Sequence, residues 1–346
     1  MAFRVTYSVL NADLSQLHKA YDNELARVLS AEVGKDFGSF IGGKEIKSGS
    51  LIEDRNPSNA SQVLAKFHAV GEKEADQAFD ISKAAQKKWA ALAWQERVKI
   101  LRKAADLISE RNMKYSVIMS LETGKNRLEA LGDVEESADL LRYYCAQVEE
   151  NNGFSRPLGK LSPNEDTRDV LKPYGVFVVI SPFNFPMALA AGMSAGALLG
   201  GNSVILKPAQ ETPWSAHNLY ECLRDAGMPE GVFQILHGTG SVLGSYLSRH
   251  PKKDGIAFTG SKEIGMQLMR QSLAGAYAQP CFVELGGKNA CIVSDKADLA
   301  KAVEGVARSA FGLTGQKCSA LSRLYVHEAV KKEFTERLLA RVAQIK

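Results

Sequence analysis

The 346-residue sequence lacks the features that mark several classes of protein. Its five cysteines are an odd number without a C-x-x-C pair, so neither a zinc site nor a disulfide framework is predicted, and no metal is expected. No uncharged apolar run reaches the length of a membrane span, and the first residues lack the cationic start and apolar centre of a secretory signal. These absences favour a cytoplasmic protein with no membrane partner.

The sequence also lacks an excess of one charge. It has 43 basic and 39 acidic residues, a net charge of +4, and the two signs are interspersed, so no nucleic-acid partner is expected. A hydrophobic content of 45% and a charged content of 24% are ordinary for a globular protein. The length suffices for a large core and for more than one domain.

Apolar residues at helical spacing predict that the first part of the chain is mainly helical. A helix at 11–33 would have Asn11 or Asp13 as its cap, and a hairpin through Gly42 and Gly43 follows it. The segment after this hairpin is predicted to be irregular until a strand at 63–70. Four further helices are predicted, at 72–90, 93–111, 112–123 and 127–149. The polar, proline-containing residues 154–173 predict a loop or a hairpin.

From residue 174 onward, short apolar runs alternate with helical patterns. Strands are predicted at 176–180, 203–206, 233–236, 256–258 and 282–285. Helices are predicted between them at 187–200, 213–226, 242–249 and 263–273, and a last helix at 329–346. This alternation predicts an α/β fold with a doubly wound parallel sheet, in which ligands bind where the carboxyl ends of the strands face a crevice.

Cys318 lies among small and polar residues in Gly312-Leu-Thr-Gly-Gln-Lys-Cys-Ser-Ala320. A thiol on a glycine-flanked turn, beside Lys317 and backbone N–H groups, has the setting of a nucleophile. The alternative is a small buried core residue, the usual state of a free cysteine. A cysteine hydrolase or acyltransferase is a further alternative; it needs a histidine partner, and only His327 is near in the sequence.

Two other polar residues follow apolar runs. In Glu284-Leu-Gly-Gly-Lys288, two glycines without side chains follow Glu284 closely. Its carboxylate would therefore be accessible at the end of a strand, where it can act as a base. Asn184 is bracketed by prolines in Ser181-Pro-Phe-Asn-Phe-Pro186, and a rigidly held amide suits an oxyanion donor.

Together with Ile205-Leu-Lys-Pro-Ala209 and Phe258-Thr-Gly-Ser-Lys-Glu-Ile-Gly265, these three pieces resemble the aldehyde dehydrogenase superfamily in order and spacing, from about residue 40 to the end of the chain. The resemblance implies that Cys318 is the nucleophile, Glu284 the base that activates water, and Asn184 the oxyanion donor. It implies oxidation of an aldehyde to a carboxylic acid through a thiohemiacetal and a thioester.

The resemblance also implies a dinucleotide site. Gly240 and Gly244 form a glycine-rich turn with the weak spacing G-x-G-x-x-x-G, and the turn at Gly260, Ser261 and Gly265 is better placed for a phosphate at a helix N-terminus. Further cofactor contacts implied by the family are Ser181, Pro182, Phe183, Lys207, Ala209, Gln210, Phe258, Thr259 and Leu285. Gln210 stands where many NAD-preferring members of the family have a glutamate. Because its neutral amide does not repel a 2′-phosphate as a carboxylate would, NAD is favoured only modestly and NADP stays open.

The forms of the cysteine and amide loops are most similar to the branch that oxidises L-glutamate γ-semialdehyde in proline catabolism, the 1-pyrroline-5-carboxylate dehydrogenases; succinic semialdehyde is an alternative substrate. The implied domains are a helical part of the cofactor domain (1–153), an oligomerisation β-excursion (154–173), a dinucleotide-binding core (174–285) and the beginning of a catalytic domain (286–346). A homo-oligomer, dimer or higher, is expected of the full-length protein.

Family members continue for roughly another third of a full-length chain beyond Lys346. The 346 residues alone are therefore expected to show little or no dehydrogenase activity. A dinucleotide-binding module without turnover is the alternative function.

Overall fold

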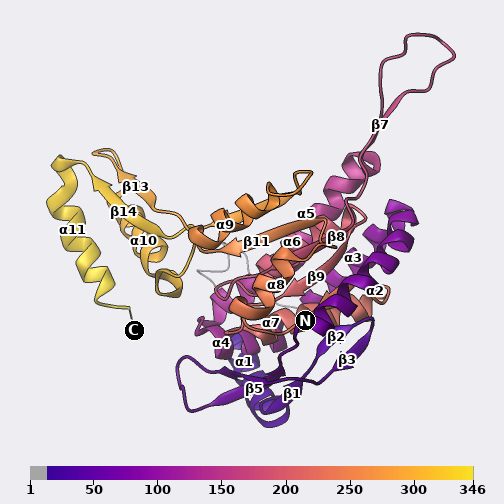
Figure 1. The fold of residues 1–346 in the computed structure, drawn as a ribbon. Helices are drawn as coiled ribbons and strands as arrows, with labels where there is room; N and C mark the ends of the chain where they lie inside the picture. Colours follow the sequence, from indigo (N-terminus) through magenta and orange to yellow (C-terminus); the bar gives the residue numbers. More distant parts are fainter. Residues whose placement is uncertain (1–13, 346) are drawn as a thin grey trace. The chain divides into compact units, whose positions relative to one another are not determined.

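The computed structural model describes residues 14–345 (Figure 1). The chain divides into two compact units. The first comprises the described residues up to Thr259 together with Ile264–Val283, and the second comprises Gly260–Glu263 together with the described residues from Glu284 onward.

The first unit is built on a seven-stranded sheet with the order β12-β11-β8-β9-β10-β2-β3. The strands that follow one another in the second half of the chain are β8 (Val176–Ile180), β9 (Ser203–Lys207), β10 (Phe233–Ile235), β11 (Gly255–Gly260) and β12 (Cys281–Leu285). β8 pairs parallel with β9 and with β11, and β10 pairs parallel with β9. The predicted parallel sheet is thus confirmed.

The predicted hairpin extends this sheet in the opposite sense. β2 (Ser39–Ile41) and β3 (Lys44–Ile46) are joined through Gly42 and Gly43, whose φ angles of 57° and 78° suit a tight turn. β2 pairs antiparallel with β10, where Phe40 lies opposite Ile235. The sheet is therefore mixed at this edge, which the sequence pattern did not predict.

The strands that follow β8 in the chain lie first on one side of it, as β9 and β10, and then on the other side, as β11 and β12. The connections through α6 (Ala188–Leu199) and α7 (Pro213–Ala226) lead from β8 to β9 and β10. A connection through η3 (Gly240–Gly244) and α8 (Ser245–Arg249) then returns to β11 on the other side of β8, and α9 (Lys262–Ser272) follows. Because such crossovers are right-handed, the reversal places helices on both faces and a topological switch point between β8 and β11.

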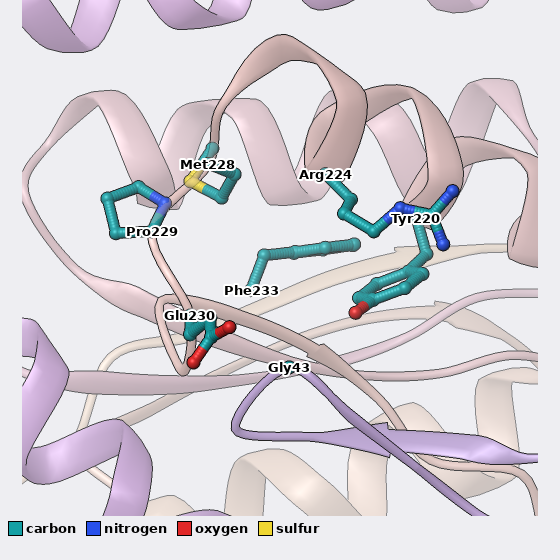
Figure 2. Close-up of a pocket in the computed structure, with 7 residues that line it drawn as sticks. All are labelled: Gly43, Tyr220, Arg224, Met228, Pro229, Glu230 and Phe233. Carbon is teal, nitrogen blue, oxygen red and sulfur yellow. The ribbon is translucent and has the colours of Figure 1, made fainter.

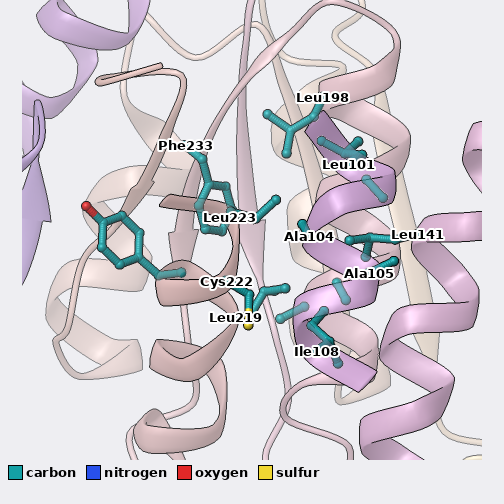
Figure 3. Packing of buried hydrophobic residues seen from close by; sticks show 14 of the residues in the cluster. Leu101, Ala104, Ala105, Ile108, Leu141, Leu198, Leu219, Cys222, Leu223 and Phe233 are labelled. Carbon is teal, nitrogen blue, oxygen red and sulfur yellow. The ribbon is translucent and has the colours of Figure 1, made fainter. Parts of the chain in front are cut away.

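In the described part of the chain, five helices precede residue 151: α1 (Ser15–Ala31), α2 (Glu72–Ala91), α3 (Trp94–Glu110), α4 (Asn112–Thr123) and α5 (Arg127–Glu150). α2 packs against the strands of the sheet, α3, α4 and α5 pack against α6 or α7, and α1 packs against α4. The core formed with α3 and α5 is shown in Figure 3 and includes Leu101, Ala104, Ala105, Ile108, Leu141, Leu198, Leu219, Cys222, Leu223 and Phe233. All five predicted helices are confirmed. Asn11 and Asp13, predicted as caps, lie outside the described residues, and α1 begins after Leu14.

Two smaller sheets accompany the main one. β1 (Lys35–Phe37), β5 (Val63–His68) and β4 (Leu51–Arg55) form a sheet with the order β1-β5-β4. The prediction of an irregular segment was wrong for β4, whose charged residues have low strand propensity but pair with β5. After η2 (Asn152–Phe154), β6 (Ser155–Pro157) and β7 (Arg168–Val170) pair as a hairpin within residues 154–173.

The second unit is a small βαβ arrangement. β13 (Asn289–Val293) and β14 (Leu321–Val326) pair parallel and are connected through α10 (Leu299–Phe311) and η4 (Gly312–Gly315), and α11 (Glu328–Val342) follows. Val293, Val303, Val306 and Phe334 form its buried core. The predicted last helix is confirmed but ends at Val342.

Within residues 14–345, no helix combines the length and the apolar composition that a bilayer span requires. The cytoplasmic location stays a prediction.

We predict that Gly255→Ala destabilises the first unit. A Cβ at residue 255 would stand 2.6 Å from Cε1 of the buried Phe177 on the neighbouring strand β8. Overpacking of this kind costs about 1–3 kcal/mol, which thermal unfolding would show as a lower Tm. Gly132→Ala is the matched control: it lies inside α5 with no atom within 4 Å of the new Cβ, and should raise stability by about 0.5–1 kcal/mol. Equal Tm values for the two variants would contradict the prediction.

Candidate functional site

Strands β8 and β9 end at the same level, and β11 ends two residues further on. Ile180, the last residue of β8, lies opposite Lys207 of β9 and opposite Phe258 of β11. The backbone N–H of Ser181 donates to the carbonyl of Lys207 at 3.2 Å. The residues that follow these strands therefore start at one edge of the sheet, which we call the carboxyl edge.

The loop that bears Asn184 leaves β8 at the carboxyl edge and enters α6. The side-chain oxygen of Asn184 accepts a hydrogen bond from the N–H of Phe185 at 3.1 Å, which makes the amide nitrogen the donor end of this side chain. Lys125 Nζ donates to the Asn184 carbonyl at 2.6 Å, and Thr212 Oγ1 donates to the Phe183 carbonyl at 3.3 Å. The amide predicted to be an oxyanion donor thus lies on a loop held by side chains from two other segments.

Lys207 is buried at the end of β9. Its Nζ donates to the Pro208 carbonyl at 2.6 Å, and burial lowers its pKa to about 8. Its stem packs against Gly244, where an added Cβ would stand 3.3 Å from Cε of the lysine. The glycine thus leaves room for the lysine, and the predicted contact of Lys207 with a ribose or a phosphate stays a prediction.

The glycine turn after β10 offers open backbone. Gly240 is exposed, with no atom within 4 Å of a Cβ built on it, and the Thr239 hydroxyl caps the turn by accepting from the Val242 N–H at 3.3 Å. At the end of β8, Ser181 Oγ is buried without a hydrogen-bond partner among the described residues. Open N–H groups, a hydroxyl and the nearby ammonium of Lys207 are the donors that a phosphate- and ribose-containing group needs.

The remaining predicted cofactor residues are divided between the two units, and Leu285 belongs to the second. Phe258 and Thr259 are buried at the end of β11, and Gly265 is buried in α9. Phe183 is exposed, while Pro182, Ala209, Gln210 and Leu285 are half-buried. Gly260 and Ser261 belong to the second unit, and Ser261 is exposed.

Cys318 lies on a turn of the second unit and is exposed, so the alternative of a core cysteine is wrong. The N–H of Ala320 donates to the Lys317 carbonyl at 3.1 Å and closes the turn. Leu313 and Thr314, which precede it, have φ angles of 46° and 53°. Left-handed backbone at such residues costs about 1–3 kcal/mol each, and strain of this kind is concentrated at functional loops.

The segment after Glu284 holds this turn. Asn289 Nδ2 donates to the carbonyl of Cys318 at 2.7 Å and to that of Ala320 at 3.3 Å. A Cβ at Gly287 would stand 3.0 Å from the same Cys318 oxygen, so a larger residue would displace the turn. Glu284 itself is exposed on β12. Sequence reasoning missed Asn289, although its place directly after the Gly-Gly-Lys run pointed to a close approach of backbone.

Asn184 belongs to the first unit, while Cys318 and Glu284 belong to the second. Their convergence on one substrate stays a prediction.

A separate surface recess is lined by Gly43, Tyr220, Arg224, Met228, Pro229, Glu230 and Phe233 (Figure 2). It lies where α7 ends and β10 begins, at the opposite edge from the strand carboxyl ends. The Glu230 side chain fills the space beside Gly43, where a Cβ would stand 2.5 Å from the carboxyl carbon. This recess is therefore not the candidate site.

The fold and the two ordered loops define a class: a doubly wound α/β protein with an exposed thiol on a strained turn. The family model for the aldehyde dehydrogenase family matches residues 44–346, and the chain belongs to this family.

Similar proteins have related names. The chain is 35% identical over 333 residues to a 1-pyrroline-5-carboxylate dehydrogenase of Geobacillus sp. (strain WCH70), covering 95% of this chain and 64% of that protein. It is 36% identical to the enzyme of the same name from Oceanobacillus iheyensis, covering 92% and 62%. A crystal structure of 1-pyrroline-5-carboxylate dehydrogenase from Thermus with bound NAD has a TM-score of 0.93 at 33% identity, covering 100% and 67%. The chain thus spans less than two thirds of the length of these two curated relatives.

We predict that Asn289→Ala loosens the cysteine turn. The loss of two hydrogen bonds, each contributing about 1 kcal/mol, should speed amide hydrogen exchange in residues 316–320 by about tenfold or more. Thr335→Ala, which removes a hydrogen bond on the exposed face of α11, is the control and should leave these residues unchanged. Exchange that is the same in wild type and Asn289→Ala would show that Asn289 does not hold the turn.

Proposed function

We propose that the residues of this chain serve NAD-dependent oxidation of an aldehyde to a carboxylic acid. The observation that supports this most directly is the exposed Cys318 on a strained turn, held by Asn289 from the segment that follows Glu284. Membership of the aldehyde dehydrogenase family supports the same reaction class.

In the proposed course, the Cys318 thiolate attacks the carbonyl carbon and forms a C–S bond. The negative charge that develops on the oxygen is stabilised by the Asn184 amide nitrogen and the Cys318 backbone N–H. NAD held at the carboxyl edge would supply the hydride acceptor, so that the thiohemiacetal carbon loses hydride and a thioester remains on the sulfur of Cys318. Glu284 takes a proton from water as the water attacks the thioester, and the acid and the thiolate are released.

The carboxyl edge of the first unit fits the cofactor. Backbone N–H groups of the Gly240–Gly244 turn can donate to a phosphate, and the Lys207 ammonium and Ser181 hydroxyl can bind ribose hydroxyls. Gly260, Ser261 and Gly265 are the further proposed contacts. The Thermus relative, crystallised with NAD, supports this choice, and NADP stays open because Gln210 is neutral.

The proposed substrate is L-glutamate γ-semialdehyde, because the curated relatives are 1-pyrroline-5-carboxylate dehydrogenases. Another semialdehyde, such as succinic semialdehyde, is the second candidate.

We further propose that the 154–173 hairpin joins subunits, since Leu158, Leu161 and Leu171 on it are exposed.

Titration with NAD and NADP, followed by an assay of aldehyde-dependent cofactor reduction, tests the proposal. Reduction that Cys318→Ala abolishes, and that Cys291→Ala on β13 retains, would support the catalytic function. Binding without reduction is expected of the 346 residues alone; in a longer protein that contains this chain it would support the alternative of a non-catalytic dinucleotide-binding module. The absence of binding would contradict both. Saturable reduction by the 346 residues alone would show the expectation of little turnover to be wrong.

We predict that NAD affinity falls as pH rises through about 8, because the Lys207 ammonium loses its proton there and attracts ribose or phosphate oxygens less. Lys207→Met should bind NAD about tenfold more weakly, with little pH dependence over this range. Affinities measured from about pH 6.5 to 9.5 by calorimetry check this. The same decline in wild type and variant would rule out a contact of Lys207 with the cofactor.

A further inference from the structure

Lys125 and Asp133 form an ion pair whose two side chains are fully buried in the first unit. Lys125 follows Gly124, the left-handed cap of α4, and Asp133 lies in the second turn of α5. Burying two charges is expensive, and an apolar pair of the same volume is often at least as stable. A role beyond stability is therefore to be sought in what else the two side chains contact.

Both charges reach the loop that bears Asn184. Lys125 Nζ donates to the Asn184 carbonyl at 2.6 Å and lies 4.0 Å from the centre of the Phe185 ring. Asp133 Oδ1 accepts from the N–H of Ala188 at 3.0 Å, the first residue of α6. One ion pair thus holds the loop at two points, at a carbonyl near its middle and at the N–H where the helix begins.

The backbone carbonyl that Lys125 holds and the side-chain amide both belong to Asn184. With the carbonyl fixed by Lys125 and the side-chain oxygen accepting from the N–H of Phe185, the direction of the amide nitrogen follows from the loop conformation. We propose that Lys125 and Asp133 are positioning residues that hold the 184–188 loop in this conformation and so aim the Asn184 amide. The role of that amide in the reaction rests on the proposed function.

Hydrogen exchange of residues 181–189 tests the positioning without any assay of activity. Lys125→Met keeps the apolar stem and removes the donor and the charge, and should speed exchange in this segment by about tenfold or more. The matched control is Lys83→Met, which breaks another ion pair of the same unit: Lys83 Nζ lies 2.6 Å from Asp254, whose carboxylate also accepts from the N–H of Val176. This control should leave residues 181–189 unchanged.

A double variant separates positioning from stability. Lys125→Met with Asp133→Asn removes both charges, so no buried charge is left unpaired, and it should unfold near the wild-type Tm while exchange in 181–189 stays fast. Slow, wild-type exchange in this double variant would overturn the proposal. If Lys125→Met does not fold, hydrogen exchange of the Ala188 amide in the wild type tests the proposal instead. We expect this amide to be protected like those in the interior of α6. Exchange at the rate of an open helix N-terminus would overturn the proposal.

Kinetics then connect the loop to the reaction. In a longer protein that contains this chain and turns over, Lys125→Met should lower kcat by about tenfold or more while KM for the aldehyde and Kd for NAD change by less than about twofold, because Lys125 is proposed to contact neither. If the loop loosens but kcat is unchanged, the positioning stands and the proposed role of Asn184 fails. If the loop stays ordered in the folded variant, the positioning fails whatever the activity shows.

Discussion

The register of β8 with both of its neighbours is the constraint on which the first unit depends. β8 is buried between β9 and β11, and its last residue, Ile180, lies opposite the last residue of β9 and opposite Phe258, two residues before the end of β11. Gly255 permits this register, because a side chain there would collide with the ring of Phe177. A shift of β8 by one residue would turn each of its side chains to the other face of the sheet. It would also displace the loop that follows β8 along the strand direction relative to the other loops at the carboxyl edge.

Two carboxylates bind backbone N–H groups at the two edges of this sheet; that of Asp133 is fully buried and that of Asp254 is partly exposed. At the amino ends, Asp254 accepts from the N–H of Val176 and pairs with Lys83 of α2. At the carboxyl edge, Asp133 accepts from the N–H of Ala188 and pairs with Lys125. In both places a carboxylate binds a backbone N–H that the strand or helix leaves without an internal partner, and a lysine pairs with the carboxylate. At Asp133 this lysine also offsets the cost of burying the charge. The arrangement couples helix packing to the ends of the central strand.

Local pattern predicted the regular elements because each helix and each central strand has its own apolar period. It did not predict that β2 pairs with β10, since Phe40 and Ile235 meet only in the tertiary structure. It missed β4, where Glu53, Asp54 and Arg55 look like loop residues. Among residues of the site, Cys318 was identifiable from its small and polar neighbours. Lys125 was not, because only burial distinguishes it from a solvated lysine.

The two candidate catalytic loops are also held differently, one by buried contacts and the other by exposed ones. Within the first unit, the Asn184 loop is ordered by the buried ion pair of Lys125 and Asp133 and by the contact of Lys125 with the Phe185 ring. In the second unit the cysteine turn is exposed, and hydrogen bonds from Asn289 order it against the strain of the left-handed backbone that precedes it. A buried ion pair resists displacement by water, whereas exposed hydrogen bonds exchange with solvent and hold less firmly. In the proposed reaction, Asn184 as the oxyanion donor would therefore be held more rigidly than Cys318, and the cysteine turn would be the one that adjusts as the sulfur passes from thiolate to tetrahedral adduct to thioester.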